Sequence, residues 1–456
     1  MTTDQAAATE FAFEEINLSH NRACNAIGEG LWGMLAGFTT TATVLPALLV
    51  KLHASDLEKG TLGGAELVGF MLPGLLGVYM LADLKQYKRP LVFYHLYICC
   101  PILALLGVVV QFAETLPNGL VRAAVVGGVT LFDVSIGFIA PTWFHWLAAL
   151  FPIKHRGTSL SFAAGLSSIS SAAAAFVASE LIEGKYIGVL REHPLAYPLN
   201  FAVLFYAAAA LGCISMISFW LVREPAVIPP SGVRKDWGDI RRKIGQSLAD
   251  RNFRFFLIGR IAEYVAFTFL GFFTYYFLTP EGGNLTDGEV TLYGAIMPIT
   301  AAIFALVLGQ LGDRFGHKLG KVMGLGWMVM AFGLILFVNP ATLSPSSTAL
   351  WVLVTFALRG FFLGSMFSGF NFIFESCPHD SLAVHFTASS LVVSPFVMVA
   401  GLLAGEIIDR AGHLPLYWLG LATASFSLLW YVFAVRDPRT LPSRGANGTP
   451  SSSTMH

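Results

Sequence analysis

The chain consists mainly of long apolar runs that alternate with short polar breaks. A helix needs about 20 apolar residues to cross roughly 30 Å of hydrocarbon, and twelve runs of about this length are present. The pattern therefore predicts an all-α, multi-pass membrane protein with twelve transmembrane helices. The expected spans are 26–50, 63–83, 91–112, 120–150, 158–181, 199–222, 254–278, 290–312, 320–338, 348–375, 383–408 and 414–435.

Polar segments divide these runs into two groups of six. The largest break is rich in proline, lysine and arginine, and it contains a stretch at 236–250 that we expect to form a surface helix. The last residues are rich in Ser, Gly and Pro, a composition typical of disorder. The expected organisation is 1–25 as a cytoplasmic N-terminal segment, 26–222 as a first six-helix bundle, 223–253 as a cytoplasmic linker, 254–435 as a second six-helix bundle and 436–456 as a disordered cytoplasmic tail.

The distribution of basic residues predicts the orientation. Most of the 28 Lys and Arg residues fall in the linker, in the tail and in the loops that share their side of the membrane. Cytoplasmic loops carry an excess of these residues, so we expect both termini in the cytoplasm and the protein in the cytoplasmic (inner or plasma) membrane. Residues 1–20 contain no Lys or Arg and no apolar stretch, which is unlike a signal peptide.

Composition excludes several other classes of protein. Charged residues make up 12% of the chain and the mean hydropathy is +0.66, whereas soluble domains average about 25% charged residues. Acidic and basic residues number 28 each, so no net charge favours nucleic acid binding. The five cysteines form no CxxC pair, and no HExxH, GxSxG or P-loop motif occurs. We therefore expect no metal, no cofactor, no enzyme activity and no ATP-driven pump.

The two groups of six runs repeat each other. Leu81-Ala82-Asp83 ends the second run and Leu311-Gly312-Asp313 ends the eighth, and a lysine follows each Asp five residues later. Near the starts of runs one and seven, Ile27-Gly28-Glu29 matches Ile258-Gly259-Arg260. Transporters built from two related six-span halves show such internal symmetry.

The loop after the eighth run resembles the loop motif of the major facilitator superfamily. The matching residues are Gly309, Leu311, Gly312, Asp313, Arg314, Gly316 and Lys318. Shorter matches are Pro152 with Arg156-Gly157, and Arg223-Glu224-Pro225. The resemblance implies two pseudo-symmetric six-helix bundles and a secondary transporter that works by alternating access. It also implies a gating role for Asp313 and its loop, and a weaker one for Asp83, whose loop lacks the glycine and arginine partners.

Charged residues inside the runs are the main functional candidates, because a charge at mid-bilayer costs about 2.5–3.5 kcal/mol on insertion scales. They are Glu29, Asp133, Arg260, Glu263 and Arg359, on runs one, four, seven and ten. In the superfamily these four helices line the central cavity. We assign ion coupling to Asp133 and Glu29. Asp133 and Arg359 occupy equivalent repeat positions, as do Glu29 and Arg260, so acidic and basic faces would meet when the halves close. The alternative is static neutralisation, with Arg260 and Glu263 paired on one helix face.

The substrate is less well defined by the sequence. Trp32, Tyr264 and Asn371 are candidate cavity residues beside the charged network. Asp133-Val134 with Pro141 resembles the fourth span of glycoside–cation symporters and plant sucrose transporters, which favours a sugar-like neutral solute with a proton or Na⁺. The alternatives are a drug or amphiphile exporter, an organic-anion exporter that uses Arg260 and Arg359, and a transporter-like sensor without flux. Expected partners are the small-molecule substrate and the lipid bilayer, with the protein as a monomer.

Overall fold

The computed structural model describes residues 3–81, 84, 86–151, 153–225, 236–376 and 382–440. Helices dominate this part of the chain, and no strand occurs in it. Eleven helical segments of the described residues are long and apolar enough to cross a membrane. The remaining expected span, 26–50, lies in two helices that are separated by a break at residues 39–43. The all-α, multi-pass architecture is confirmed.

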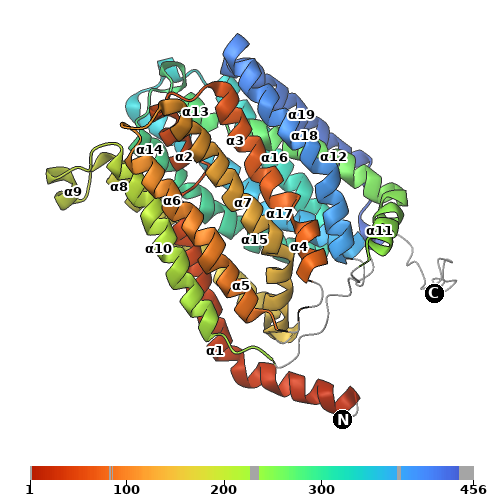
Figure 1. Cartoon of the computed structure of the whole chain (residues 1–456). Coiled ribbons are helices and arrows are strands. Elements are labelled where there is room, and N and C mark those ends of the chain that lie inside the picture. The colour runs from red at the N-terminus through yellow and green to blue at the C-terminus, as the bar shows by residue number, and fades with distance from the viewer. Residues whose placement is uncertain are drawn as a thin grey trace.

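The first half packs as one group of long helices (Figure 1). Its elements are α1 (Thr3–Phe38), α2 (Val44–Lys51), α3 (Asp56–Met71), α4 (Gly74–Leu81), α5 (Lys88–Tyr94), η1 (His95–Cys99), α6 (Cys100–Gln111), α7 (Asn118–Ala149), α8 (Ile153–Glu183), α9 (Gly188–Glu192) and α10 (Leu199–Leu221). Glycines bring α1 close to α8: a Cβ on Gly33 would lie 2.1 Å from the Ser167 carbonyl oxygen, and one on Gly37 would lie 2.5 Å from that of Ser171. Small residues are the usual means of close helix packing in membranes.

The second half begins with the expected surface helix. Its elements are α11 (Trp237–Ala249), α12 (Arg251–Leu270), α13 (Phe273–Phe277), η2 (Pro280–Gly282), α14 (Asp287–Gly294), α15 (Ile296–Phe315), α16 (His317–Phe337), η3 (Pro340–Thr342), α17 (Pro345–Ser376), α18 (Leu382–Ala411), α19 (His413–Phe433) and η5 (Pro438–Thr440). Helices α7 and α17, each of 32 residues, correspond to the two runs that exceed an upright crossing. The Asp250 side chain accepts a hydrogen bond from the Phe253 amide and so caps the start of α12.

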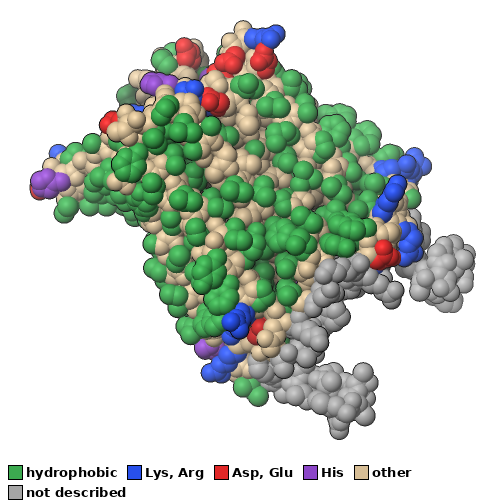
Figure 2. Space-filling view, in the orientation of Figure 1, with side chains coloured by type: hydrophobic (Ala, Val, Ile, Leu, Met, Phe, Trp, Pro, Cys, Tyr) green, Lys and Arg blue, Asp and Glu red, His purple; other side chains and the backbone are tan. Residues whose placement is uncertain are grey.

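Both ends of the described chain lie at one end of the bundles, which we call the terminal end. Asn17 accepts a hydrogen bond from Arg223 after α10, and Asn252 at the start of α12 donates one to the Arg436 carbonyl oxygen. The opposite end, with the loops around residues 52–55 and 338–344, is called the far end. Figure 2 shows apolar side chains over the flank between these ends, whereas charged side chains gather toward the ends. This distribution suits a protein surrounded by lipid.

Helices α3 and α18 join the two halves at the far end. A Cβ on Gly60 would lie 2.2 Å from the Gly401 carbonyl oxygen, and one on Gly405 would lie 2.4 Å from that of Asp56. The two helices therefore touch through their backbones. Because α3 begins at Asp56 and α18 ends at Ala411, this contact lies at the far end of both helices.

Polar contacts reinforce the same junction. Ser179 on α8 donates to the Gly288 carbonyl oxygen at 2.8 Å. Further polar contacts that cross between the halves here are Thr286 to Glu183 at 2.9 Å, Lys185 to Glu289 at 3.0 Å, Lys51 to Asp287 at 3.2 Å, and Thr274 to the Ala42 carbonyl oxygen. We call this set, together with the glycine crossing of α3 and α18, the far-end contact.

Candidate functional site

A group of charged side chains lies between the halves, below the far-end contact. It consists of Glu66 on α3, Asp133 on α7 and Arg359 on α17. Glu66 is within electrostatic range of both of the others. Gly69, one turn after Glu66, lets α3 approach α7 at this level, because a Cβ there would lie 3.2 Å from the Asp133 Cβ. We call these three residues the central charge cluster.

A cavity of about 70 Å³ opens beside Glu66 and Arg359. Its walls come from both halves, with Thr41 and Glu66 on one side and Tyr275 and Arg359 on the other. Thr41 donates a hydrogen bond to Glu66 at 2.7 Å. Lys59, which also lines the cavity, pairs with Asp56 at 2.5 Å. The cavity therefore lies at a boundary that must change when the halves move apart.

The cluster leaves buried polar atoms without partners. The Arg359 side chain is 6% exposed, and its Nε and Nη1 atoms have no hydrogen-bond partner among the described residues. The Oδ2 atom of Asp133 also has no hydrogen-bond partner among the described residues. The Arg359 guanidinium also lies 5.8 Å from the centre of the Phe267 ring. Unpaired buried polar groups are costly, so these atoms mark the cluster as a candidate functional site.

Sequence reasoning named Asp133 and Arg359 but missed Glu66, which lies between them. The signal was present: Glu66 is a carboxylate in an otherwise apolar stretch, close to the start of the second run. The expected candidates lie on runs one, four, seven and ten, whereas Glu66 lies on run two. The contribution of α3 depends on how this helix crosses α7, which hydropathy does not report.

Glu29 and Trp32 belong to an aromatic group within the first half. The Trp143 side chain hydrogen-bonds the Glu29 carboxylate. His95 makes edge contacts with Trp32 and Trp143, at centroid distances of 5.2 and 4.9 Å. Trp32 also stacks on Phe132 at 6.3 Å, directly next to Asp133 in the chain. The group thus joins α1, η1 and α7, and it combines aromatic faces with a carboxylate.

A second set of buried charges lies in the second half. Glu263 on α12 forms an ion pair with Lys321 on α16, and their side chains are 0% and 2% exposed. This corrects the pairing weighed from the sequence, in which Arg260 is the partner considered for Glu263. Lys321 lies inside α16, and its long side chain reaches across to the neighbouring helix.

Arg260 lies beside this ion pair. It donates to the Tyr264 hydroxyl at 3.2 Å, and its guanidinium lies 5.1 Å from the centre of that ring. A Cβ on Gly369 would lie 3.2 Å from Lys321 Nζ and 3.4 Å from Arg260 Nη1. Two cationic side chains therefore converge on the α17 backbone. Asn371, the remaining candidate, lies partly buried on the same helix.

The loop motif sits at the terminal end of the second half. Gly316 adopts φ +89° between α15 and α16, and a Cβ there would lie 1.9 Å from Asp437 Oδ2. Both the backbone conformation and the lack of space therefore require glycine. Lys318 donates to the Val432 carbonyl oxygen at 3.0 Å, and Arg314 is exposed. Gly309 has open space around its Cβ position. Asp83 and the side chain of Asp313 lie outside the described residues, so the gating role stays a prediction.

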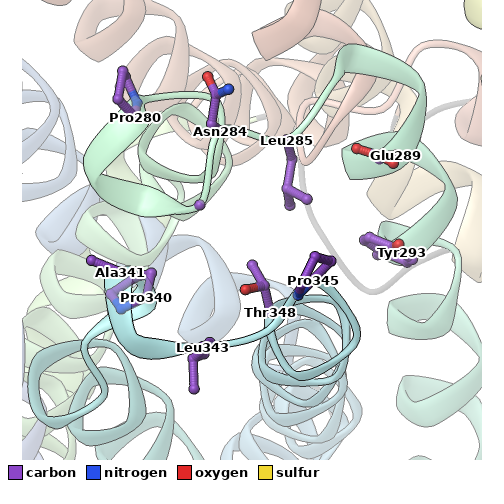
Figure 3. A pocket seen from close by; sticks show the side chains of 11 residues that line it. Pro280, Asn284, Leu285, Glu289, Tyr293, Pro340, Ala341, Leu343, Pro345 and Thr348 are labelled. Carbon is purple, nitrogen blue, oxygen red and sulfur yellow. The ribbon is translucent and has the colours of Figure 1, made fainter.

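A larger cavity, of about 370 Å³, opens at the far end of the second half (Figure 3). It lies between the segment 280–293 and the segment 340–348, and its lining is mostly neutral. Glu289 in its wall already pairs with Lys185 across the halves. None of the residues assigned from the sequence lines this cavity. Among the residues described, no group of three or more His, Cys, Asp and Glu side chains could hold a metal ion.

Comparison with known proteins gives a family and a fold. A family profile described as Major Facilitator Superfamily matches residues 30–387. The nucleoside transporter NupG superposes with a TM-score of 0.60 at 16% identity, over 92% of this chain and 99% of that one. The D-xylose-proton symporter gives 0.61 at 17% identity, over 92% and 99%. The xylose transporter XylE from E. coli, in an inward open conformation, gives 0.60 at 16% identity, over 91% and 96%. No curated protein matches, and at these identities the structural likeness shows the fold alone.

Proposed function

The chain belongs to the Major Facilitator Superfamily and is a transporter rather than an enzyme; from this premise we propose that it moves a small solute by secondary active transport, coupled to a proton or cation gradient. The observation that carries the proposal is the central charge cluster, which lies between the halves and contains residues of both. A coupling site must change its environment when the halves rearrange. In this proposal, Asp133 and Arg359 lie where such a change takes place.

We further propose that the structure represents the inward-facing state. The far-end contact joins the halves through α3, α8, α14 and α18. With the predicted topology, both termini are cytoplasmic and the far end faces outward, so the outer entrance is the closed one. Alternating access then requires the far-end contact to break when the outer side opens.

For the substrate we propose a sugar-like neutral solute. The aromatic group around Trp32 and Trp143 supplies flat apolar faces, and Glu29 beside it supplies a hydrogen-bond acceptor. Flat faces with a few directed polar groups are typical of small-molecule sites. The xylose transporters among the similar structures are consistent with this class.

An organic-anion exporter is the second candidate. One observation favours it: Arg260 and Lys321 converge at Gly369 in the second half, where an anionic group would be attracted. A drug or amphiphile exporter and a sensor without flux are the remaining outcomes. Purified protein in liposomes should be tested for uptake of sugars, nucleosides, organic anions and amphiphiles, with and without a pH gradient. Binding without flux for every class would indicate the sensor.

The coupling assignment is tested with Asp133→Asn, which mimics a permanently protonated carboxyl. We expect this variant to lose gradient-driven accumulation while it retains substrate exchange, because exchange needs no net proton movement. Glu29→Gln should have a weaker effect, since Glu29 already has Trp143 as a partner. Wild-type accumulation by Asp133→Asn would show that Asp133 is a structural charge.

A further inference from the structure

We propose that Glu66 and Asp133 together form the proton-binding site of the transporter, and that Arg359 discharges the proton when the far end closes. The inference deepens the proposed transport function and rests on it. It assigns to Glu66 a role that neither the repeat symmetry nor the family match indicates. The proton is bound when the far end is open and is released when the far end is closed.

The geometry places two carboxyl groups in one half and their counter-charge in the other. Glu66 and Asp133 lie on neighbouring helices of the first half, where Gly69 permits close approach of α3 to α7. Arg359 belongs to α17 of the second half and lines the same cavity as Glu66. When the halves part at the far end, Arg359 leaves with the second half, whereas Glu66 and Asp133 stay together.

The surrounding groups do not replace Arg359 as a counter-charge. Lys59, on the same helix as Glu66, is already paired with Asp56 at 2.5 Å. Tyr275 of α13 lines the cavity and lies under Lys59, at 5.4 Å from its Nζ to the ring centre. The Thr41 hydroxyl donates to Glu66 at 2.7 Å but carries no charge. The balance of charge at the two carboxyls therefore depends on the distance to Arg359.

Elementary electrostatics then gives the direction of the cycle. Two neighbouring carboxylates in a poorly solvated site repel each other, so they hold one proton between them. The proton comes from water on the outer side, and one carboxylate becomes a carboxylic acid. When the far end closes, the Arg359 guanidinium approaches and stabilises the ionised form. The acid then loses its proton to water that reaches the site from the terminal end.

The site favours a proton over a sodium ion. Sodium needs several oxygen ligands at once, whereas a proton needs a single carboxylate oxygen. The Thr41 hydroxyl, a neutral oxygen beside the cluster, donates its proton to Glu66 in a hydrogen bond. The Arg359 guanidinium, with two nitrogen atoms free of hydrogen bonds in the described structure, would repel a metal cation.

The test measures conformation rather than transport, so that it needs no known substrate. Spin labels in the far-end loops 112–117 and 338–344 report the distance between the halves by electron–electron double resonance. In wild type, we expect acidification from about pH 8 to about pH 5 to raise the ratio of far-end-open to far-end-closed molecules by about tenfold, the effect of one unit of difference in proton affinity between the states.

Variants separate the residues. Glu66→Gln should reduce this pH response, and the double variant Glu66→Gln with Asp133→Asn should remove it. Arg359→Gln should also flatten the response, because the proton is no longer discharged on closing. Glu58→Gln is the matched control: Glu58 lies on the same helix but pairs with Arg122 inside the first half at 2.9 Å, so this variant should respond like wild type.

Several results would overturn the inference. A wild-type pH response in Glu66→Gln would show that Glu66 does not hold the proton. Loss of the response in Glu58→Gln would show that any carboxyl on α3 has this effect. A shift caused by Na⁺ at constant pH would show that the site binds a metal ion rather than a proton.

If wild type shows neither a pH response nor flux in liposomes, the proposed coupled transport fails instead. Should Glu66→Gln fail to fold, Glu66→Asp, which keeps the carboxyl, must retain the response, and its loss counts against the proposal.

Discussion

Replacing Gly60 with alanine tests whether the backbone contact between α3 and α18 controls access from the far end. The new Cβ would lie 2.2 Å from the Gly401 carbonyl oxygen, more than 1 Å short of an ordinary carbon contact of about 3.5–4.0 Å. Overpacking of this kind costs about 1–3 kcal/mol. Because the clash is between the halves, it disappears when the far end opens. The open-to-closed ratio should therefore rise by about 5- to 150-fold.

The measurement is the same far-end distance distribution, recorded for wild type and Gly60→Ala at constant pH. Gly63→Ala is the matched control, three residues further along α3, where a Cβ would meet no atom within 4 Å. Gly63→Ala favours the helix by the same free energy as Gly60→Ala, about 1 kcal/mol, but introduces no clash. An unchanged distribution in Gly60→Ala would refute the reasoning. An equal shift in Gly63→Ala would attribute the effect to helix propensity rather than to contact between the halves.

Further predictions address the loop motif, the second-half ion pair and the topology. Asp313→Asn should slow transport in proteoliposomes without preventing membrane insertion, and equal flux would remove its gating role. Lys321→Met leaves Glu263 buried without its partner, so we expect a loss of about 3–5 kcal/mol in the free energy of unfolding, measured by denaturation in detergent. Adding Glu263→Gln to that variant should restore most of the loss, and no recovery would contradict the ion pair. Cysteines in the loop 279–290 should be labelled from the side opposite to those in the linker 223–254; labelling from one side would contradict the topology.

The fold could be read from the sequence because membrane spans are set by length and hydropathy. Each run must cover the same thickness of hydrocarbon, so a span is visible without knowledge of its neighbours. The first span has the longest interruption among the described helices that make up one span, at residues 39–43 between α1 and α2. The broken stretch, three threonines, an alanine and a fourth threonine, contains no proline or glycine that would signal it.

The central charge cluster could be predicted only in part. Charge inside a run identifies Asp133 and Arg359, and repeat symmetry relates their positions. Charge inside a run also marks Glu66, but its place in the cluster arises from the crossing of α3 and α7 at Gly69. Lys321 lies at the start of a run, where snorkelling of a lysine to the surface is common. Its burial depends on Glu263 in another helix, and pairing of this kind is not encoded in local hydropathy.

The buried pair of Glu263 and Lys321 also sets an order of assembly during synthesis. Helix α12 brings Arg260 and Glu263 into the bilayer, and the partner of Glu263 follows 58 residues later. Each unpaired charge at depth costs about 2.5–3.5 kcal/mol on insertion scales. Until α16 enters, the insertion of α12 into lipid is therefore less favourable. The helix avoids part of this free-energy cost by staying near the translocation machinery. The second half becomes stable as a group of helices that enter together, and a ribosome that stalls before α16 leaves an incomplete bundle with an exposed acid inside the membrane.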